Sequence, residues 1–149
     1  MSYSRKNLSL MIFILCIILL NIVIGLYLII NYEEKKNSND LVVEITDGDT
    51  FVIENKTIIR LLCVNTPEKG EEGYSEAKEF LQSLIFYKEV KLIEPKTLNK
   101  TDKYGRELRF VYVEINKKEV FVNKEILEFG FGKYYPYEDK KKECEMVRN

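Results

Sequence analysis

The chain has 149 residues, with 23 Lys plus Arg against 24 Asp plus Glu, and it contains no histidine. The near-neutral balance excludes a broad basic coat for nucleic acid, so a polyanion would need a local cluster or a bound cation. The lack of histidine excludes imidazole catalysis, Ser-His triads and His-ligated zinc. Cys16, Cys63 and Cys144 have no metal-ligand spacing and predict no disulfide framework, and Cys63 is expected to be a small core residue.

The N-terminal region predicts a membrane anchor. Residues 8–30 carry no charge and are long enough to cross a bilayer. No small-residue cleavage site follows Ile30, which favours an uncleaved signal anchor over a removed signal peptide. We expect a short tail at 1–7, the transmembrane helix at 8–30, a polar linker at 31–39 and one domain at 40–149. The basic tail favours a cytoplasmic N-terminus, although Lys35 and Lys36 follow the span, so this single-pass protein of the cell membrane would carry its domain outside the cytoplasm.

The domain shows the pattern of a small barrel. Strands are predicted at 41–46, 50–54 and 57–64, with Asp47-Gly48 as a hairpin turn. Apolar residues recur at helical spacing from Tyr74 to Ile85, and strands follow at 89–94 and 108–115. Residues 120–122 are expected to pair briefly before a short helix that Asn123 caps and Gly130 closes. Five strands with too few crossover helices predict an α+β, mainly β, barrel with about three helices.

Three polar clusters lie at the ends of these elements, at 47–50, 65–68 and 101–106. Asp47 and Asp49 could form half of a hard-cation site, although Asp-Gly is more often a plain turn. Asn65 and the Thr66 carbonyl could add oxygens to that site, while Glu68 is either a general base or a solvated loop residue.

Arg60 stands inside an apolar run, so its charge requires a carboxylate partner, access to the surface or an anionic ligand. Taken alone, access to the surface is the favoured reading. If Arg60 and Arg106 faced one point, they would suit a phosphate whose negative charge grows as a nucleophile adds.

Four stretches of the chain together resemble the staphylococcal nuclease, or thermonuclease, family. They are Asp47-Gly48-Asp49-Thr50, Arg60-Leu61-Leu62 leading to Thr66-Pro67-Glu68, Thr101-Asp102-Lys103-Tyr104-Gly105-Arg106, and Val122 to Leu127 followed by Gly130. They occur in the family's order between Leu41 and Lys133.

The resemblance implies a five-stranded OB-fold barrel and a calcium-dependent endonuclease that cleaves DNA and RNA to leave 3′-phosphate ends. It implies Asp49, Asn65, the Thr66 carbonyl and Asp47 as the calcium site. It implies Glu68 as the base for water, and Arg60 and Arg106 as ligands of the scissile phosphate. Four residues would bind substrate: Lys103, Tyr104, Tyr135 and Tyr137.

Two departures from the family leave a rival hypothesis open. Asn65 stands where the family has aspartate, and the chain stops where the family continues its last helix. The rival is a tethered OB-type module that binds nucleic acid or protein without cleaving it, and a truncated, unstable remnant is a third alternative. We expect nucleic acid and the membrane as partners, no protein partner, and a monomer.

Overall fold

The computed structural model describes residues 5–36, 39–96, 99–136 and 141–148. The chain forms two compact units, Met1–Ser38 and Asn39–Asn149. The first unit contains helix α1 (Arg5–Lys36), in which Leu10–Ile29 is long and apolar enough to cross a membrane. The helix continues through residues 31–36, where the sequence predicted a polar linker. Within α1, the Asn21 amide donates to the Ile17 carbonyl, which keeps this polar side chain on its own helix.

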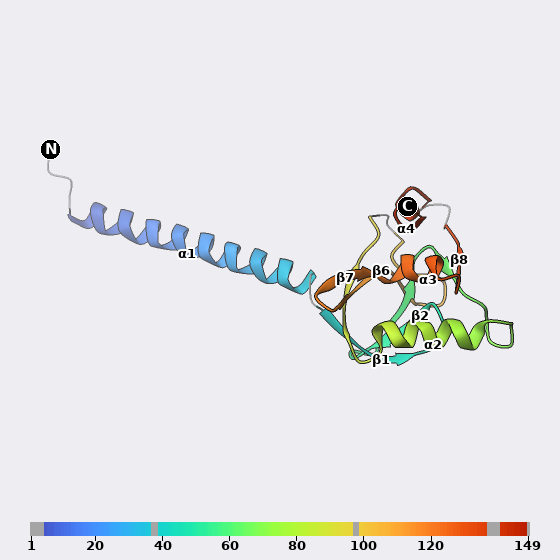
Figure 1. The fold of residues 1–149 in the computed structure, drawn as a ribbon. Coiled ribbons are helices and arrows are strands. Elements are labelled where there is room, and N and C mark those ends of the chain that lie inside the picture. The colour runs from blue at the N-terminus through green and yellow to red at the C-terminus, as the bar shows by residue number, and fades with distance from the viewer. Residues whose placement is uncertain (1–4, 37–38, 97–98, 137–140, 149) are drawn as a thin grey trace. The chain divides into compact units, whose positions relative to one another are not determined.

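The second unit contains a closed barrel built from strands that the sequence predicted. In its described residues, five strands form the ring: β1 (Asn39–Ile45), β2 (Thr50–Ile53), β3 (Ile58–Leu61), β5 (Glu89–Ile93) and β6 (Glu107–Ile115). Neighbouring strands are antiparallel except for β3 and β6, whose parallel pairing of Arg60 with Leu108 closes the barrel. Figure 1 shows the strands of the barrel with α2 and α3 beside them. The predicted OB-fold barrel is confirmed.

The core is filled by alternate residues of these strands, as the period-two pattern of a barrel requires. Phe51 and Ile53 of β2 and Ile59 and Leu61 of β3 are fully or almost fully buried. A register shift between Val42 and Glu44 marks a bulge in β1, which helps a strand bend around a barrel.

The third predicted strand, 57–64, is interrupted. β3 ends at Leu61, and β4 (Val64–Asn65) begins after a turn in which Cys63 has a φ of 68°. A left-handed residue cannot continue a strand, so the chain changes direction there. β4 then pairs with β8 (Lys133–Tyr134) in a separate ribbon. This turn brings Asn65 to the rim of the barrel.

The helices cover the barrel through their apolar faces. The predicted helix α2 (Tyr74–Ile85) buries Ala77, Leu81 and Ile85. β7 (Lys118–Phe121) forms a hairpin with β6 and leads into α3 (Val122–Glu128). The predicted capping role of Asn123 is wrong, because Asn123 lies inside α3 and is fully buried.

The Asn123 side chain instead joins three backbone segments. Its Oδ1 accepts from Val111 N, and its Nδ2 donates to the carbonyls of Leu62 and Arg109. A fully buried amide needs such partners, so Asn123 holds α3 against β6 and the turn after β3.

The cysteine prediction is also wrong in one respect. Cys63 and Cys144 form a disulfide across 81 residues of sequence, which joins the turn after β3 to α4 (Lys141–Arg148). Both cysteines are fully buried, so Cys63 is a core residue as expected but not a free thiol. A loop of this length corresponds to about 4 to 5 kcal/mol of stabilisation in the chain-entropy model. Cys16 of α1 is free.

Candidate active site

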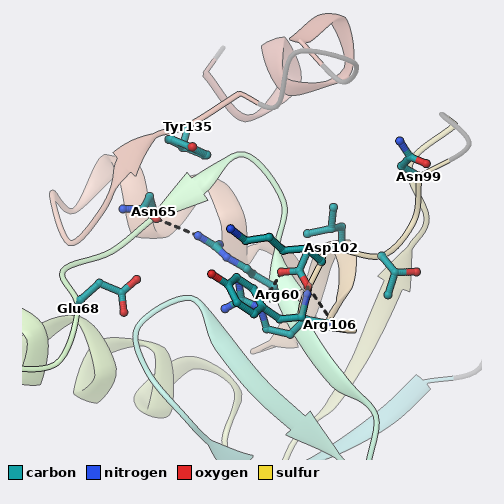
Figure 2. Close-up of a pocket in the computed structure, with 11 residues that line it drawn as sticks. Arg60, Asn65, Glu68, Asn99, Asp102, Arg106 and Tyr135 are labelled. Carbon is teal, nitrogen blue, oxygen red and sulfur yellow. Dashed lines mark hydrogen bonds and ion pairs between the residues drawn. The ribbon is translucent and has the colours of Figure 1, made fainter.

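A cavity of about 480 Å³ lies where the end of β3, the turn before β6 and the end of β8 meet. Its lining residues are Arg60, Asn65, Glu68, Asn99, Thr101, Asp102, Lys103, Tyr104, Arg106, Leu108 and Tyr135. It therefore brings together both predicted arginines, the predicted base and three of the predicted substrate-binding residues (Figure 2). Tyr137, the fourth of these, lies outside the described residues.

Arg60 is buried on β3 and is held by several acceptors. Its Nη1 lies 3.0 Å from Asp49 Oδ2 and donates to the carbonyls of Leu61 and Val64. Its Nη2 donates to Asn65 Oδ1 at 2.9 Å, which Figure 2 shows as a dashed line. A guanidinium has five N–H donors, so Nε and one hydrogen of Nη2 remain beyond these bonds. The expected reading with a carboxylate partner is thus confirmed. The favoured reading, access to the surface, is wrong, because the Arg60 side chain is only 5% exposed. Arg60 also lines the cavity.

Asp49 is the buried carboxylate behind this wall. Its Oδ1 accepts from Thr50 Oγ1, and its Oδ2 accepts from Thr66 N. Burial raises the pKa of Asp49 to about 6, because the loss of water outweighs the opposing charge of Arg60. Asp47 Oδ1 accepts from Asp49 N and so fixes the turn that presents this carboxylate. Asp47, Asp49 and Thr66 are not among the residues that line the cavity.

Arg106 is oriented by the turn that precedes β6. Asp102 Oδ2 accepts from Arg106 Nε at 2.8 Å, and Asp102 Oδ1 accepts from the backbone N atoms of Tyr104 and Arg106. Partial burial would raise the pKa of Asp102, but the hydrogen bonds from Arg106 and Tyr104 outweigh it and lower that pKa.

One hydroxyl connects the two arginines. Arg106 Nη1 donates to Thr50 Oγ1 at 3.4 Å, and Thr50 Oγ1 in turn donates to Asp49, the partner of Arg60. The sequence placed Thr50 in a motif but assigned it no role. Its position here links Arg106 to the pair formed by Asp49 and Arg60.

Glu68 follows β4 in an exposed loop and contributes to the opposite side of the cavity from Arg106. In Figure 2 its carboxylate extends from that loop toward the interior. The backbone N of Glu68 donates to Glu71 Oε2, which holds the loop in a tight turn. Glu68 can therefore face solvent and a ligand together, as a general base must.

The remaining lining residues form two outer walls. On one side, Lys103 Nζ lies 4.9 Å and Arg106 Cζ 5.3 Å from the centre of the exposed Tyr104 ring. On the other side stands Tyr135, which is about half exposed. Exposed aromatic rings beside cations suit nucleotide bases and phosphates. Asn99 and Leu108 also line the cavity, and sequence reasoning missed both because neither belongs to a recognisable motif.

The residues predicted to hold a cation offer oxygen atoms only. They are the carboxylates of Asp49 and Asp47, the amide oxygen of Asn65 and the carbonyl of Thr66, a set that fits a hard cation such as calcium. Asn65 Oδ1 already accepts from Arg60, which leaves it one lone pair for another partner. Among the described residues, no group of three or more acidic or cysteine side chains is placed to hold a metal. The donor chemistry fits, but the site carries little negative charge.

Comparison with known proteins identifies relatives of the chain. The family model described as staphylococcal nuclease homologue matches residues 58–149, more than half of the chain. An uncharacterised protein of Methanocaldococcus jannaschii is 30% identical over 120 residues, covering 63% of this chain and 58% of the relative. A micrococcal nuclease of Shigella flexneri is 31% identical over 113 residues, covering 70% and 63%.

An uncharacterised endonuclease of Haemophilus influenzae is 26% identical over 121 residues, covering 78% of this chain and 66% of the relative. The chain thus spans roughly three fifths to two thirds of the length of these relatives. The fold, the order of the motifs and the family match agree. The chain belongs to the staphylococcal nuclease family.

Proposed function

We propose that this protein is a membrane-anchored, calcium-dependent endonuclease that hydrolyses phosphodiester bonds of DNA, RNA or both. The observation that carries the proposal is that Arg60, Arg106 and Glu68 line one cavity although they come from different parts of the chain. The names of two relatives, a micrococcal nuclease and an endonuclease, support the same class of reaction.

The two arginines provide the binding site for the phosphate. A phosphodiester carries one negative charge, and the charge on its oxygens increases as water adds to phosphorus. Arg60 is held by Asp49 and Asn65, and Arg106 by Asp102, so both cations are positioned before substrate arrives. Preorganised donors of this kind stabilise the transition state more than the ground state.

Glu68 acts as the general base in this proposal. Its carboxylate accepts a proton from the attacking water, and the water oxygen bonds to phosphorus. The bond from phosphorus to the leaving 5′ oxygen breaks, and that oxygen takes a proton from solvent to become a hydroxyl. The product then carries a 3′-phosphate, as the family resemblance implies. Asp49, Asp47, Asn65 and the Thr66 carbonyl would hold calcium, which supplies Lewis-acid polarisation of the phosphate when bound.

We also propose that the domain lies outside the cytoplasm. Leu10–Ile29 would serve as the anchor. The Cys63–Cys144 disulfide supports this orientation, because disulfides persist in oxidising compartments and are rare in the cytosol.

The first test is the cleavage of single-stranded DNA by the full chain in detergent, with calcium and then with a chelator. Glu68→Gln should lower kcat by about two orders of magnitude or more while leaving the fold intact, because Glu68 is exposed. Glu79→Gln, on the exposed face of α2, is the matched control. Arg60→Ala is less informative, because it would also leave the buried Asp49 without its cation.

The second candidate function is a binding module without catalysis. The observation that favours it is the low negative charge of the proposed cation site, where Asn65 is neutral and bound to Arg60. Retention of an oligonucleotide with no cleavage under any calcium concentration would support this alternative and overturn the nuclease proposal.

A further inference from the structure

Helix α4 is bonded to Cys63, which contacts the segment that carries Tyr135, and to the start of the connection between β5 and β6. It is only eight residues long, and five of these residues are charged. Cys144 and Val147 are its buried residues. A helix this short is not stable by itself in water, so the contacts at its ends and its buried face determine where it lies.

The first wall, which carries Tyr135, is joined to α4 through the disulfide. Cys63 binds Cys144 of α4, and the Cys63 carbonyl accepts from the backbone N of Tyr135 at 2.9 Å. The pairing of β4 with β8 aligns Asn65 with Lys133 in the same ribbon. In addition, the Arg148 guanidinium of α4 lies 5.6 Å from the centre of the Tyr134 ring. Helix α4, Cys63 and the Tyr135 segment therefore form one connected group.

The connection between β5 and β6 is joined to α4 through a hydrogen bond. The backbone N of Lys96 donates to Glu143 Oε2 of α4 at 2.7 Å. Lys96 belongs to the connection between β5 and β6, whose later residues Asn99 and Thr101 line the cavity. Helix α4 thus links the Tyr135 segment to Lys96, at the start of the connection that also contains Asn99.

We propose that the Cys63–Cys144 disulfide makes α4 a strut that holds the Tyr135 wall in place relative to the connection between β5 and β6, so that both cysteines are positioning residues for substrate binding. This inference rests on the proposed nuclease function. Arg60, Asp49 and Arg106 are held by bonds within the barrel and its turns, none of which involves α4. Loss of the strut should therefore weaken substrate binding and spare the chemical step.

The proposal makes substrate affinity dependent on the redox state. A dithiol reductant opens the bond by thiol–disulfide exchange: two electrons and two protons pass to the cysteines, which become thiols, and the reductant is oxidised to its own disulfide. Oxidation by a disulfide such as glutathione disulfide reverses the step. The protein would then bind substrate poorly in a reducing compartment and well in an oxidising one.

The position of each wall can be measured without any activity. The chain contains no tryptophan, so Tyr135→Trp and Tyr104→Trp each introduce a single fluorophore, one in each outer part of the cavity. In full chains with and without Cys144→Ala, we expect acrylamide quenching of the Tyr135→Trp signal to rise about twofold or more when the disulfide is lost. The Tyr104→Trp signal should not change, because Asp102 fixes that turn.

Two fluorescence results would overturn the proposal. If neither signal changes, α4 is held without the disulfide. If both change together, the disulfide stabilises the barrel as a whole and does not position one wall. Circular dichroism of the same variants detects destabilisation of the whole barrel independently.

Kinetics of otherwise wild-type chains complete the test. Cys144→Ala should raise KM for a short single-stranded oligonucleotide about tenfold, the size of one lost base–aromatic contact, and change kcat less than twofold. Glu143→Ala keeps the disulfide but removes the contact with Lys96, and it should raise KM several-fold. An unchanged KM in both variants, or a loss confined to kcat, would contradict the strut. Complete absence of cleavage in the wild type would refute the nuclease proposal but leave the fluorescence result valid.

Discussion

Asp102 is a small residue with a large effect on the geometry of the site. It accepts three hydrogen bonds and holds the Arg106 guanidinium at its Nε. We expect Asp102→Asn to lower kcat/KM for oligonucleotide cleavage about tenfold or more, because a charge-assisted bond that orients a phosphate ligand is lost. Glu114→Gln, an exposed residue of β6, should have no effect. Equal activity of both variants would show that Arg106 does not need this partner.

Because the pKa of Asp102 is lowered, the contribution of this residue to the stability of the fold depends on pH. The folded state binds its proton more weakly than the unfolded state, whose pKa is near 3.8. Its carboxylate therefore stabilises the fold above that pH, and this contribution is lost as the pH falls through the folded pKa. We expect the stability difference between wild type and Asp102→Asn to be constant near neutrality and to shrink below about pH 4. Urea denaturation over this range measures it, and a difference that grows in acid would contradict the assignment.

In the proposed cation site, Asn65 offers a neutral oxygen where an aspartate would add a negative charge. Asn65→Asp would add a third carboxylate to the proposed set, next to Arg60, and hard cations bind more tightly as the number of charged ligands rises. We expect this variant to bind calcium at least several-fold more tightly in isothermal titration calorimetry. Asn55→Asp, in an exposed turn remote from these residues, is the control. Unchanged affinity would place the cation away from Asn65.

At the scale of residues, the sequence predicted the members of the site better than their contacts. The motifs supplied Arg60, Glu68 and Arg106, and the structure places all three at one cavity. The bond between Arg60 and Asn65 could not be predicted, because it depends on the turn that Cys63 introduces. The Cys63–Cys144 pairing was missed for a similar reason, since proximity of two residues so far apart follows only from the path of the whole chain.

At the scale of elements, Gly48 allows α2 to pack against the turn between β1 and β2. A Cβ at this position would lie 2.6 Å from Ala77 Cβ of α2 and 2.9 Å from Thr66 Oγ1. We expect Gly48→Ala to cost about 1–3 kcal/mol of unfolding free energy, because neither neighbour can move without disturbing the core or the Thr66 bond to Asp49. Denaturant titration measures the change.

Gly70→Ala separates this steric effect from a backbone effect. Gly70 has a φ of 96°, and a Cβ at this position would meet only open space, so its replacement should cost only about 1 kcal/mol for the left-handed conformation. If the two variants were equally destabilised, close packing at Gly48 would not be the cause.

The elements themselves were largely predictable, because alternation and helical spacing mark the barrel strands and α2 directly. The boundaries of the elements differed from the predicted ones where a single residue determined the path of the chain. Asn123 resembles a helix cap in sequence, but the hairpin before α3 carries it into the interior, where three backbone groups require an amide. Helix α4 has too few apolar residues to be recognised without its disulfide.

At the scale of the whole molecule, calcium should stabilise the fold if it binds the proposed site. A ligand that binds only the folded state at ten times its dissociation constant adds about 1.4 kcal/mol to the unfolding free energy. We expect a rise of this size in the wild type and a smaller one in Asp49→Asn at the same calcium concentration. Denaturation with calcium and with chelator measures both. A gain that survives in Asp49→Asn would place the cation elsewhere.

The parallel pairing of β3 with β6 has a consequence for the synthesis of this protein. Arg60 lies within β3, Arg106 immediately precedes β6, and the register aligns Ile59 with Glu107. The two arginines of the proposed phosphate site therefore come together in the same contact that closes the barrel. While the chain is still being made, or is crossing a membrane unfolded, this contact is absent and so is the site. For the nuclease that we propose, the arginine pair would therefore be assembled only after the domain has folded.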